Sequence, residues 1–232
     1  MKSRIKAVIC VLSALVILAG SCYVNDYYKA MERAIEATSF AEYLEEDTLV
    51  FEADSKYGII FYPGGKVEHT AYAPLMKACA EAGITCVLVH MPCNLAVLDI
   101  DAAQGIQERF PKVEDWYMAG HSLGGSMAAS YIVESAEEYK GLILLASYST
   151  ENLNEGGLKV LSVYGTEDEV LNMEKYEENR GNLPGDYEEV VIDGGCHAYF
   201  GNYGEQEGDG EAKISPGMQQ EITVEAIKNF IK

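Results

Sequence analysis

The feature that most constrains this chain is the pattern Gly-x-Ser-x-Gly at residues 120–124. Residues 113–119, which precede it, are typical of a strand entering a core, and residues 125–136 after it are rich in Ala, Met and Ser, as helices often are. A turn between two such elements is so tight that the glycine positions have almost no room for a side chain. The pattern therefore predicts that Ser122 stands clear of a sheet as a nucleophile, at the N-terminus of a helix.

Strands and helices are predicted to alternate along most of the chain. Runs typical of strands lie at 48–53, 58–62, 84–89, 113–119, 141–146, 158–164 and 187–192. Runs typical of helices lie at 71–82, 97–109, 125–136, 173–179 and 219–231. Several of these strands are apolar throughout, which indicates a mostly parallel sheet covered by helices on both faces. We expect an α/β fold in one domain, residues 47–232, with the first two strands as neighbours.

The N-terminal residues are typical of a targeting signal. Basic side chains at positions 2, 4 and 6 precede an apolar run at 7–19. A basic start followed by a short apolar run indicates a secretory signal or a signal anchor. Residues 1–24 therefore have three predicted fates: an uncleaved membrane anchor, which we favour, cleavage near Ala19, or lipidation of Cys22. Each fate would place the rest of the chain on the outer side of the cell membrane, anchored, lipidated or secreted.

Composition excludes several classes of function. Lys and Arg number 17 and Asp and Glu number 37, so the formal net charge is −20. A surface so acidic repels phosphate backbones, and nucleic acid is therefore not expected as a partner. The six cysteines show no Cys-x-x-Cys spacing, so we expect no metal site and no cofactor. Residues 25–46 are polar with scattered apolar side chains, which favours a loosely packed helical stalk without chemistry, and the oligomeric state is left open.

A serine nucleophile needs a base, and the base needs a carboxylate that orients it. In enzymes that carry such a serine on an α/β sheet, the acid and then the histidine follow it in the chain, each on a loop after a strand. Asp168 follows the predicted strand 158–164, and His197 follows the last one, 187–192. Both side chains are therefore predicted at the carboxyl edge of the sheet, together with Ser122.

Other residues compete for these two roles. Asp193 is the rival acid, but the two glycines after it favour a turn residue. His69 and His90 precede the serine, which is the wrong order for the base. His121 adjoins the serine and is expected to point away from it. The sequence therefore favours the aspartate and histidine on the two later loops.

The negative charge that develops on a substrate carbonyl oxygen needs two backbone N–H donors, an oxyanion hole. Leu123, directly after the nucleophile, is expected to supply one. The loop after the predicted strand 58–62 is expected to supply the other, with Gly65 as the first choice and Lys66 as the second. An ordinary glycine turn is the alternative interpretation of this loop.

Several of these runs together resemble one known family. They are similar to the α/β-hydrolase fold, in a compact branch like the dienelactone hydrolases and related bacterial hydrolases. The resemblance is carried by residues 61–67, 71–75, 91–97, 120–125 and 194–201. It implies a serine hydrolase that cleaves small carboxylic esters or related acyl compounds through an acyl-enzyme. Dienelactone hydrolases usually carry a cysteine nucleophile, so their own substrate is not carried over to a chain with Ser122.

The same resemblance leaves alternatives and makes further predictions. An acyltransferase or amidase with the same residues, or a non-catalytic binding module on this fold, is the alternative function. Residues 147–157 form only a short loop where larger lipases insert a helical lid, so we expect an open site for a small acyl substrate. The acidic loop 202–211 does not match a calcium loop and is expected to be a solvated rim. Cys93 and Cys196 approach the predicted site, and free thiols are favoured over a disulfide.

Overall fold

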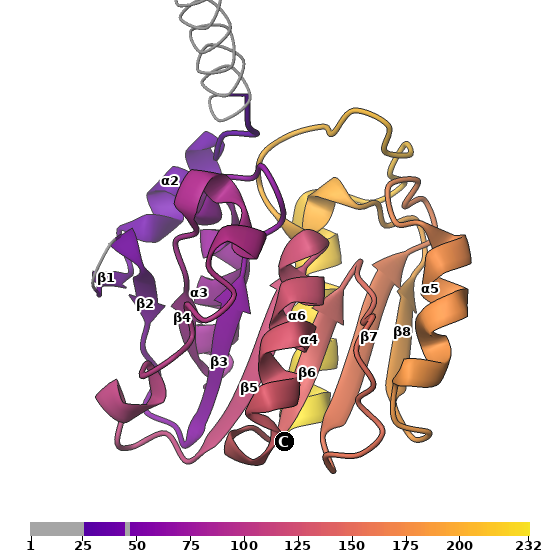
Figure 1. The fold of residues 1–232 in the computed structure, drawn as a ribbon. Coiled ribbons are helices and arrows are strands. Elements are labelled where there is room, and N and C mark those ends of the chain that lie inside the picture. The colour runs from indigo at the N-terminus through magenta and orange to yellow at the C-terminus, as the bar shows by residue number, and fades with distance from the viewer. Residues whose placement is uncertain (1–25, 45–46) are drawn as a thin grey trace, which may run out of the picture.

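The computed structural model describes residues 26–44 and 47–232, and Figure 1 shows how they are arranged. The strands are β1 (Glu42–Tyr43), β2 (Leu49–Phe51), β3 (Tyr57–Tyr62), β4 (Thr85–Leu88), β5 (Asp115–His121), β6 (Gly141–Leu145), β7 (Lys159–Gly165) and β8 (Glu188–Ile192). The longer helices are α2 (Glu32–Thr38), α3 (Ala73–Glu81), α4 (Leu123–Glu134), α5 (Met173–Asn179) and α6 (Pro216–Ile231).

The strands of the described residues form one eight-stranded sheet in the order β1-β2-β4-β3-β5-β6-β7-β8. The strands from β4 to β8 pair in parallel, and β2 joins β4 in the antiparallel direction. The predicted mostly parallel sheet is confirmed. The prediction that the first two strands are neighbours is wrong, because Cys86 of β4 pairs with Phe51 of β2 on one side and with Ile59 of β3 on the other. A fully buried, apolar strand such as β4 needs a partner at both edges.

Helices cover both faces of the sheet, as the apolar strands predict (Figure 1). Neighbouring residues of one strand point to opposite faces, so each strand contributes to two cores. In β3, Ile59 and Phe61 pack toward α3 and α6, whereas Ile60 and Tyr62 pack toward α4. The carboxyl ends of the parallel strands therefore meet at one edge, and the loops that follow them are held by a core on each side.

Residues 97–109 are not the predicted helix. The structure has two 3₁₀ turns, at Ala96–Leu98 and Gln107–Arg109, joined by irregular chain. The Tyr62 hydroxyl donates to the carbonyl oxygen of Ile100 at 2.7 Å and accepts the N–H of Ala103 at 2.9 Å. A buried tyrosine thus replaces the helical hydrogen bonds that this segment would otherwise make. Such a distant partner is invisible to local periodicity.

The segment 25–46 is not one continuous helix where the structure describes it. Helix α2 covers Glu32–Thr38 and buries Ala34 and Ala37 against the domain, and β1 pairs with β2 at the edge of the sheet. The predictions for residues 1–24, including the anchor and the lipidation of Cys22, lie outside the described residues. No helix within the described ranges combines the length and apolar character needed to cross a membrane.

Acid is expected to destabilise the fold through His69, a buried residue at the start of a 3₁₀ turn (His69–Tyr72). Burial, and secondly the neighbouring His90, lower the pKa of His69 to about 4, from an ordinary value of 6.5. The unfolded chain therefore binds the extra proton first as the pH falls. Stability is lost between pH 6.5 and pH 4, by about 3 kcal/mol in the free energy of unfolding.

The measurement is urea unfolding at several pH values across that window. His69→Gln keeps an N–H that can reach the carbonyl oxygen of Asp47, which His69 Nε2 contacts at 3.0 Å, but it has no proton to gain. The stability of the variant should fall less than that of the wild type over the same window. Equal slopes for the two proteins would contradict the prediction.

Candidate active site

The turn between β5 and α4 holds Ser122 in a conformation that a non-glycine residue seldom adopts. Its φ is 52° and its ψ is −123°, a strain of about 1–3 kcal/mol in general. A Cβ atom on Gly120 would lie 2.5 Å from the carbonyl carbon of Gly124. A Cβ atom on Gly124 would lie 2.2 Å from the carbonyl oxygen of Pro63. Both glycines are therefore required for this close approach, and the turn has the geometry that the sequence pattern predicts.

The loops after β7 and β8 run against each other. A Cβ atom on Gly165 would lie 2.1 Å from the carbonyl oxygen of Gly195, and the N–H of Glu167 donates to that same oxygen at 2.8 Å. This contact brings Asp168 and His197 together. The structure therefore joins two residues that the sequence predicts as acid and base.

His197 Nδ1 lies 2.9 Å from Asp168 Oδ2 and 3.1 Å from Oδ1, and both side chains are buried. An ionised carboxylate only accepts hydrogen bonds, so Nδ1 carries the proton and leaves Nε2 of the neutral ring as an acceptor. Asp168 Oδ1 also accepts the N–H groups of Val170 at 3.0 Å and Leu171 at 2.7 Å, which fix the carboxylate. The rival acid, Asp193, is exposed and is not the carboxylate on His197.

His121 does not point away from the site as predicted. It is buried, its ring centroid lies 4.5 Å from that of His197, and its Nδ1 lies 2.8 Å from the Tyr72 hydroxyl. Burial, and secondly the nearby His197, hold the pKa of His121 well below its usual value. His121, the residue before Ser122, is therefore a neutral ring that packs against His197.

The two residues predicted as oxyanion donors, Gly65 in the loop after β3 and Leu123 in α4, lie next to each other. A Cβ atom on Gly65 would lie 2.9 Å from Leu123 Cδ2, so these two residues are adjacent. Leu123 is the first residue of α4, where N–H groups have no partner inside the helix. Within the described chain no hydrogen bond uses the Gly65 N–H. The Lys66 N–H donates to the carbonyl oxygen of Asn94 at 2.8 Å, so this second choice for the donor is engaged elsewhere.

Two residues that hold the loop around His197 could not be recognised from the sequence. Asp209, in the loop predicted as a solvated rim, accepts the N–H of His197 at 3.1 Å and that of Ala198 at 2.8 Å. Gln219 of α6 accepts the N–H of Cys196 at 3.0 Å and donates to its carbonyl oxygen at 2.7 Å. Both contacts join residues distant in sequence, and neither Asp209 nor Gln219 stands in a local pattern that signals the role.

Asp209→Asn is expected to lower turnover by roughly 10–100-fold. The N–H groups of His197 and Ala198 donate to the two carboxylate oxygens of Asp209, whereas an amide has only one oxygen that can accept them. The NH₂ group of the asparagine would face one of these two backbone N–H groups, and the loop that carries His197 would shift. The test compares kcat and thermal unfolding of Asp209→Asn with those of Glu207→Gln, which removes one charge from the same loop at an exposed position. Equal activity of the two variants would show that Asp209 does not position the base.

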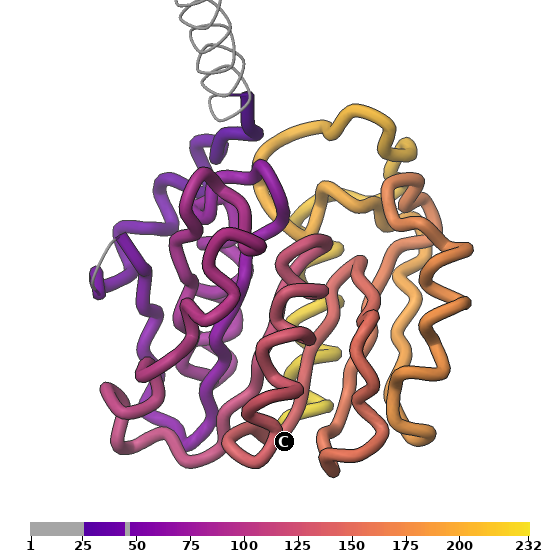
Figure 2. Tube along the Cα trace, viewed as in Figure 1, coloured from indigo at the N-terminus to yellow at the C-terminus, as the bar shows by residue number. Residues whose placement is uncertain are grey.

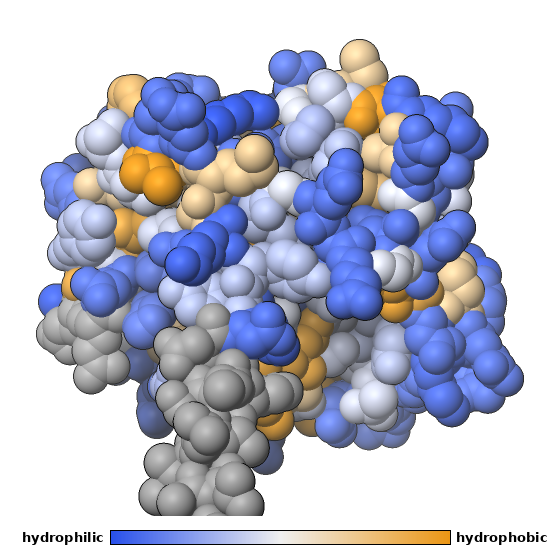
Figure 3. All heavy atoms as spheres, turned by 90° about the horizontal axis from the view of Figure 1, so that it is seen from above, coloured by the Kyte–Doolittle hydropathy of each residue, from blue (hydrophilic) through white to orange (hydrophobic). Residues whose placement is uncertain are grey.

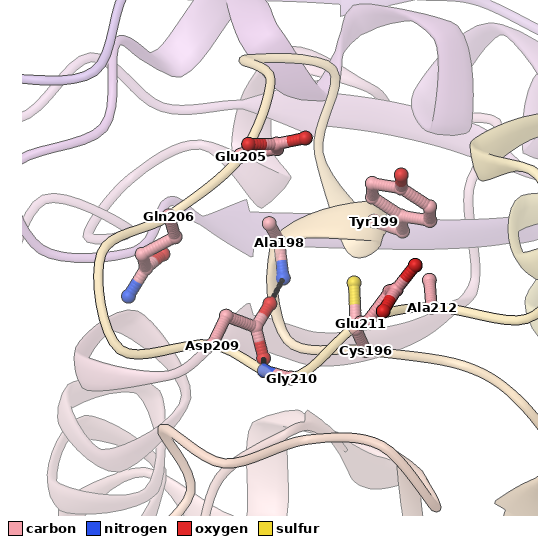
Figure 4. Close-up of a pocket in the computed structure, with 9 residues that line it drawn as sticks. All are labelled: Cys196, Ala198, Tyr199, Glu205, Gln206, Asp209, Gly210, Glu211 and Ala212. Atoms are coloured by element: carbon pink, nitrogen blue, oxygen red, sulfur yellow. Dashed lines mark hydrogen bonds between the residues drawn. The ribbon is translucent and has the colours of Figure 1, made fainter.

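A polar cavity of about 400 Å³ is lined mainly by residues that follow His197 in the chain (Figure 4). Glu205 and Glu211 are exposed at its rim, while the carboxylate of Asp209 is turned to the backbone N–H groups. Burial raises the pKa of the Cys196 thiol to about 12, so this group stays protonated. The cysteines at positions 79, 86, 93 and 196 are free thiols. No cluster of metal-ligating side chains occurs within the described ranges.

Solved structures of several hydrolases share this fold. Est1E from Butyrivibrio proteoclasticus is 17% identical, with a TM-score of 0.57 over 83% of this chain and 97% of that one. A dienelactone hydrolase from Anabaena variabilis is 11% identical, with a TM-score of 0.58 over 83% and 96%. A monoacylglycerol lipase from Paleococcus ferrophilus is 12% identical, with a TM-score of 0.61 over 79% and 98%. At these identities the likeness shows the fold alone.

The sequence itself also matches a family description. No curated protein matches the chain. A sequence model of the Alpha/beta hydrolase family matches residues 58–221, which run from β3 into α6. The match includes the turn at Ser122 and the loops after β7 and β8. This match spans most of the chain and agrees with the sheet order and the turn at Ser122. The chain belongs to the alpha/beta hydrolase family.

Proposed function

We propose that this protein is a serine hydrolase that cleaves small carboxylic esters or related acyl compounds. The observation that carries the proposal is the buried contact of 2.9 Å between His197 and Asp168, with the ring of His121, the residue before the strained Ser122, packed against that of His197. Acyl transfer to serine needs a serine nucleophile, a base and an acid that orients the base. Similar folds solved as an esterase from Thermogutta terrifontis and as a monoacylglycerol lipase support ester cleavage.

In the proposed mechanism, Ser122 Oγ attacks the carbonyl carbon of the ester while His197 Nε2 takes its proton. Asp168 holds the Nδ1–H side of the ring and stabilises the imidazolium that forms. His197 then gives the proton to the leaving alkoxide, and the acyl group remains on the serine. Water releases it in a second half-reaction through the same base.

The tetrahedral intermediate carries its negative charge on the former carbonyl oxygen. The N–H groups of Gly65 and Leu123 are the proposed donors to that oxygen. The adjacency of the two residues supports this role, and so does the position of Leu123 at the N-terminus of α4, where the helix dipole favours negative charge.

The proposed substrates are small because the connection that forms a lid in larger lipases is short here. The connection from β6 to β7, residues 146–158, contains no helix in the structure, and larger lipases carry their lid there. The face at the carboxyl ends of the strands is largely hydrophilic, with small and separate apolar patches (Figure 3). On the part of that face that Figure 3 shows, a long acyl chain would find no continuous apolar surface, whereas a short acyl group needs none.

The proposed function is tested with a panel of short-chain esters, thioesters and amides, assayed with and without an alcohol acceptor. We expect esters to be turned over fastest and the free acid to be the product in both conditions. Turnover of amides alone would contradict the ester assignment. A product that forms only with the acceptor would identify an acyltransferase instead of a hydrolase.

A further inference from the structure

The first described residues pair with the loop that carries Gly65. The N–H of Tyr28 donates to the carbonyl oxygen of Lys66 at 2.8 Å, and the N–H of Glu68 donates to the carbonyl oxygen of Tyr28 at 2.9 Å. Together they make a parallel bridge between Tyr28 and Val67. The N–H of Ala30 also donates to Glu68 Oε2 at 2.9 Å. Residues 28–31, which we name the N-terminal brace, thus extend along the oxyanion loop, residues 63–68.

Lys66 shows why this loop needs a brace. Its φ is 59°, a left-handed conformation that a residue with a long side chain seldom adopts without outside constraint. Its N–H is held by the carbonyl oxygen of Asn94, and its own carbonyl oxygen is held by the N–H of Tyr28. The two bonds fix the peptide groups on either side of Lys66. The Gly65 N–H belongs to the preceding peptide, between Gly64 and Gly65, whose carbonyl oxygen accepts the N–H of Val67 at 3.2 Å, and Val67 is the residue that bridges to Tyr28.

The brace contacts the other side of the site as well. The Tyr28 hydroxyl accepts the N–H of Glu207 at 3.1 Å, and its ring centroid lies 5.5 Å from that of Tyr203. The N–H of Met31 donates to the carbonyl oxygen of Asn202 at 2.9 Å. In Figure 2 the loop after His197 arches over the carboxyl ends of the strands and comes down beside the first described residues. The brace therefore touches both the oxyanion loop and the loop that follows the base.

We propose that the N-terminal brace is a positioning segment of the active site, which sets the Gly65 N–H against the developing oxyanion. This inference rests on the proposed function. Helix α2 fixes the brace at its far end, because Ala34 and Ala37 are buried against the domain. The brace contributes geometry and no reacting group. Loss of the brace should consequently raise the free energy of the transition state more than it weakens substrate binding.

The test uses Tyr28→Ala in the full-length chain, which removes the ring from Tyr203 and the acceptor for Glu207. Loss of one oxyanion donor lowers kcat by about 10²–10³-fold, and a loosened donor should give a fall of roughly 10-fold or more, with KM little changed. Affinity for a boronic acid that forms a tetrahedral adduct should fall in parallel with kcat. Tyr28→Phe, which keeps the ring, should fall between Tyr28→Ala and the wild type.

Tyr27→Ala is the matched control, because the Tyr27 ring meets only the ammonium of Lys29, at 6.0 Å, among the ring contacts described. Hydrogen exchange reports on the brace without any turnover: the amide of Glu68 should exchange faster in Tyr28→Ala and unchanged in Tyr27→Ala. Faster exchange or a lower melting temperature with unchanged kcat would overturn the inference, because the brace would then be structural only. A wild type without any Ser122-dependent turnover would instead overturn the proposed function, and the catalytic role of the brace with it.

Discussion

Ser122→Ala is expected to lower kcat by roughly 10⁶-fold while the fold stays intact. The hydroxyl is the attacking group in the proposed mechanism, and no other group can replace it there. The change keeps the Cβ atom in its strained turn, and the N–H of residue 122 still donates to the carbonyl oxygen of Leu145, at 2.9 Å in the present structure. The measurement is kcat on the best ester of the panel, with thermal unfolding as the check on folding.

Ser130→Ala is the matched control for this substitution. Ser130 also lies on α4, and its hydroxyl donates only to a backbone carbonyl oxygen one turn away, at Ser126. It should keep nearly full activity. If Ser122→Ala retained turnover comparable to that of Ser130→Ala, the nucleophile would be another residue.

Asp168→Asn is expected to lower kcat by about 10⁴-fold, because an amide no longer holds the ring of His197 in the tautomer with the proton on Nδ1. The amide can place its oxygen toward either the ring or the N–H groups of Val170 and Leu171, but it cannot serve both as the carboxylate does. The measurement is kcat against pH, because a misplaced base changes the profile as well as the maximum.

Asp193→Asn provides the comparison. It makes the same chemical change on the exposed carboxylate that the sequence offers as the rival acid. Its activity should equal that of the wild type within a factor of about two, as for most surface changes remote from a site. A larger loss in Asp193→Asn than in Asp168→Asn would assign the role of the orienting acid to Asp193.

The parts of the site that could be predicted are those with a local signature. The turn at Ser122 needs glycines two positions before and after it, since a Cβ atom at either would meet backbone. Asp168 and His197 each follow a strand, and the carboxyl ends of parallel strands meet at one edge of a sheet. A pattern of neighbouring residues therefore predicts the contact between residues far apart in the chain.

The parts that could not be predicted depend on single long-range partners. The segment 97–109 has a helical composition, but the Tyr62 hydroxyl holds it in irregular chain. Asp209 lies in an acidic, glycine-rich segment whose composition indicates exposure to solvent. Only the fold brings its carboxylate to the backbone N–H of His197. The same holds for Tyr28, whose two main-chain bonds to the oxyanion loop carry no signature in the sequence.

The order of the central strands could also not be predicted from the sequence. Either β3 or β4 could have paired with β2 on composition, because all three are short and apolar. In the structure β3 pairs in parallel with β4 at one edge and with β5 at the other, so β3 has no free edge left for β2. Sheet order is therefore settled by the pairing of the whole sheet.

Labelling with a fluorophosphonate tests whether Ser122 is an activated nucleophile, because the reagent phosphonylates an activated serine and releases fluoride without any need to know the substrate. We expect one adduct per folded chain, located by peptide mass spectrometry on Ser122. It should vanish in Ser122→Ala and after denaturation, and it should form far more slowly in Asp168→Asn. Absence of the adduct from the folded wild type, or an equal adduct in Ser122→Ala, would contradict the proposal that Ser122 is the activated nucleophile.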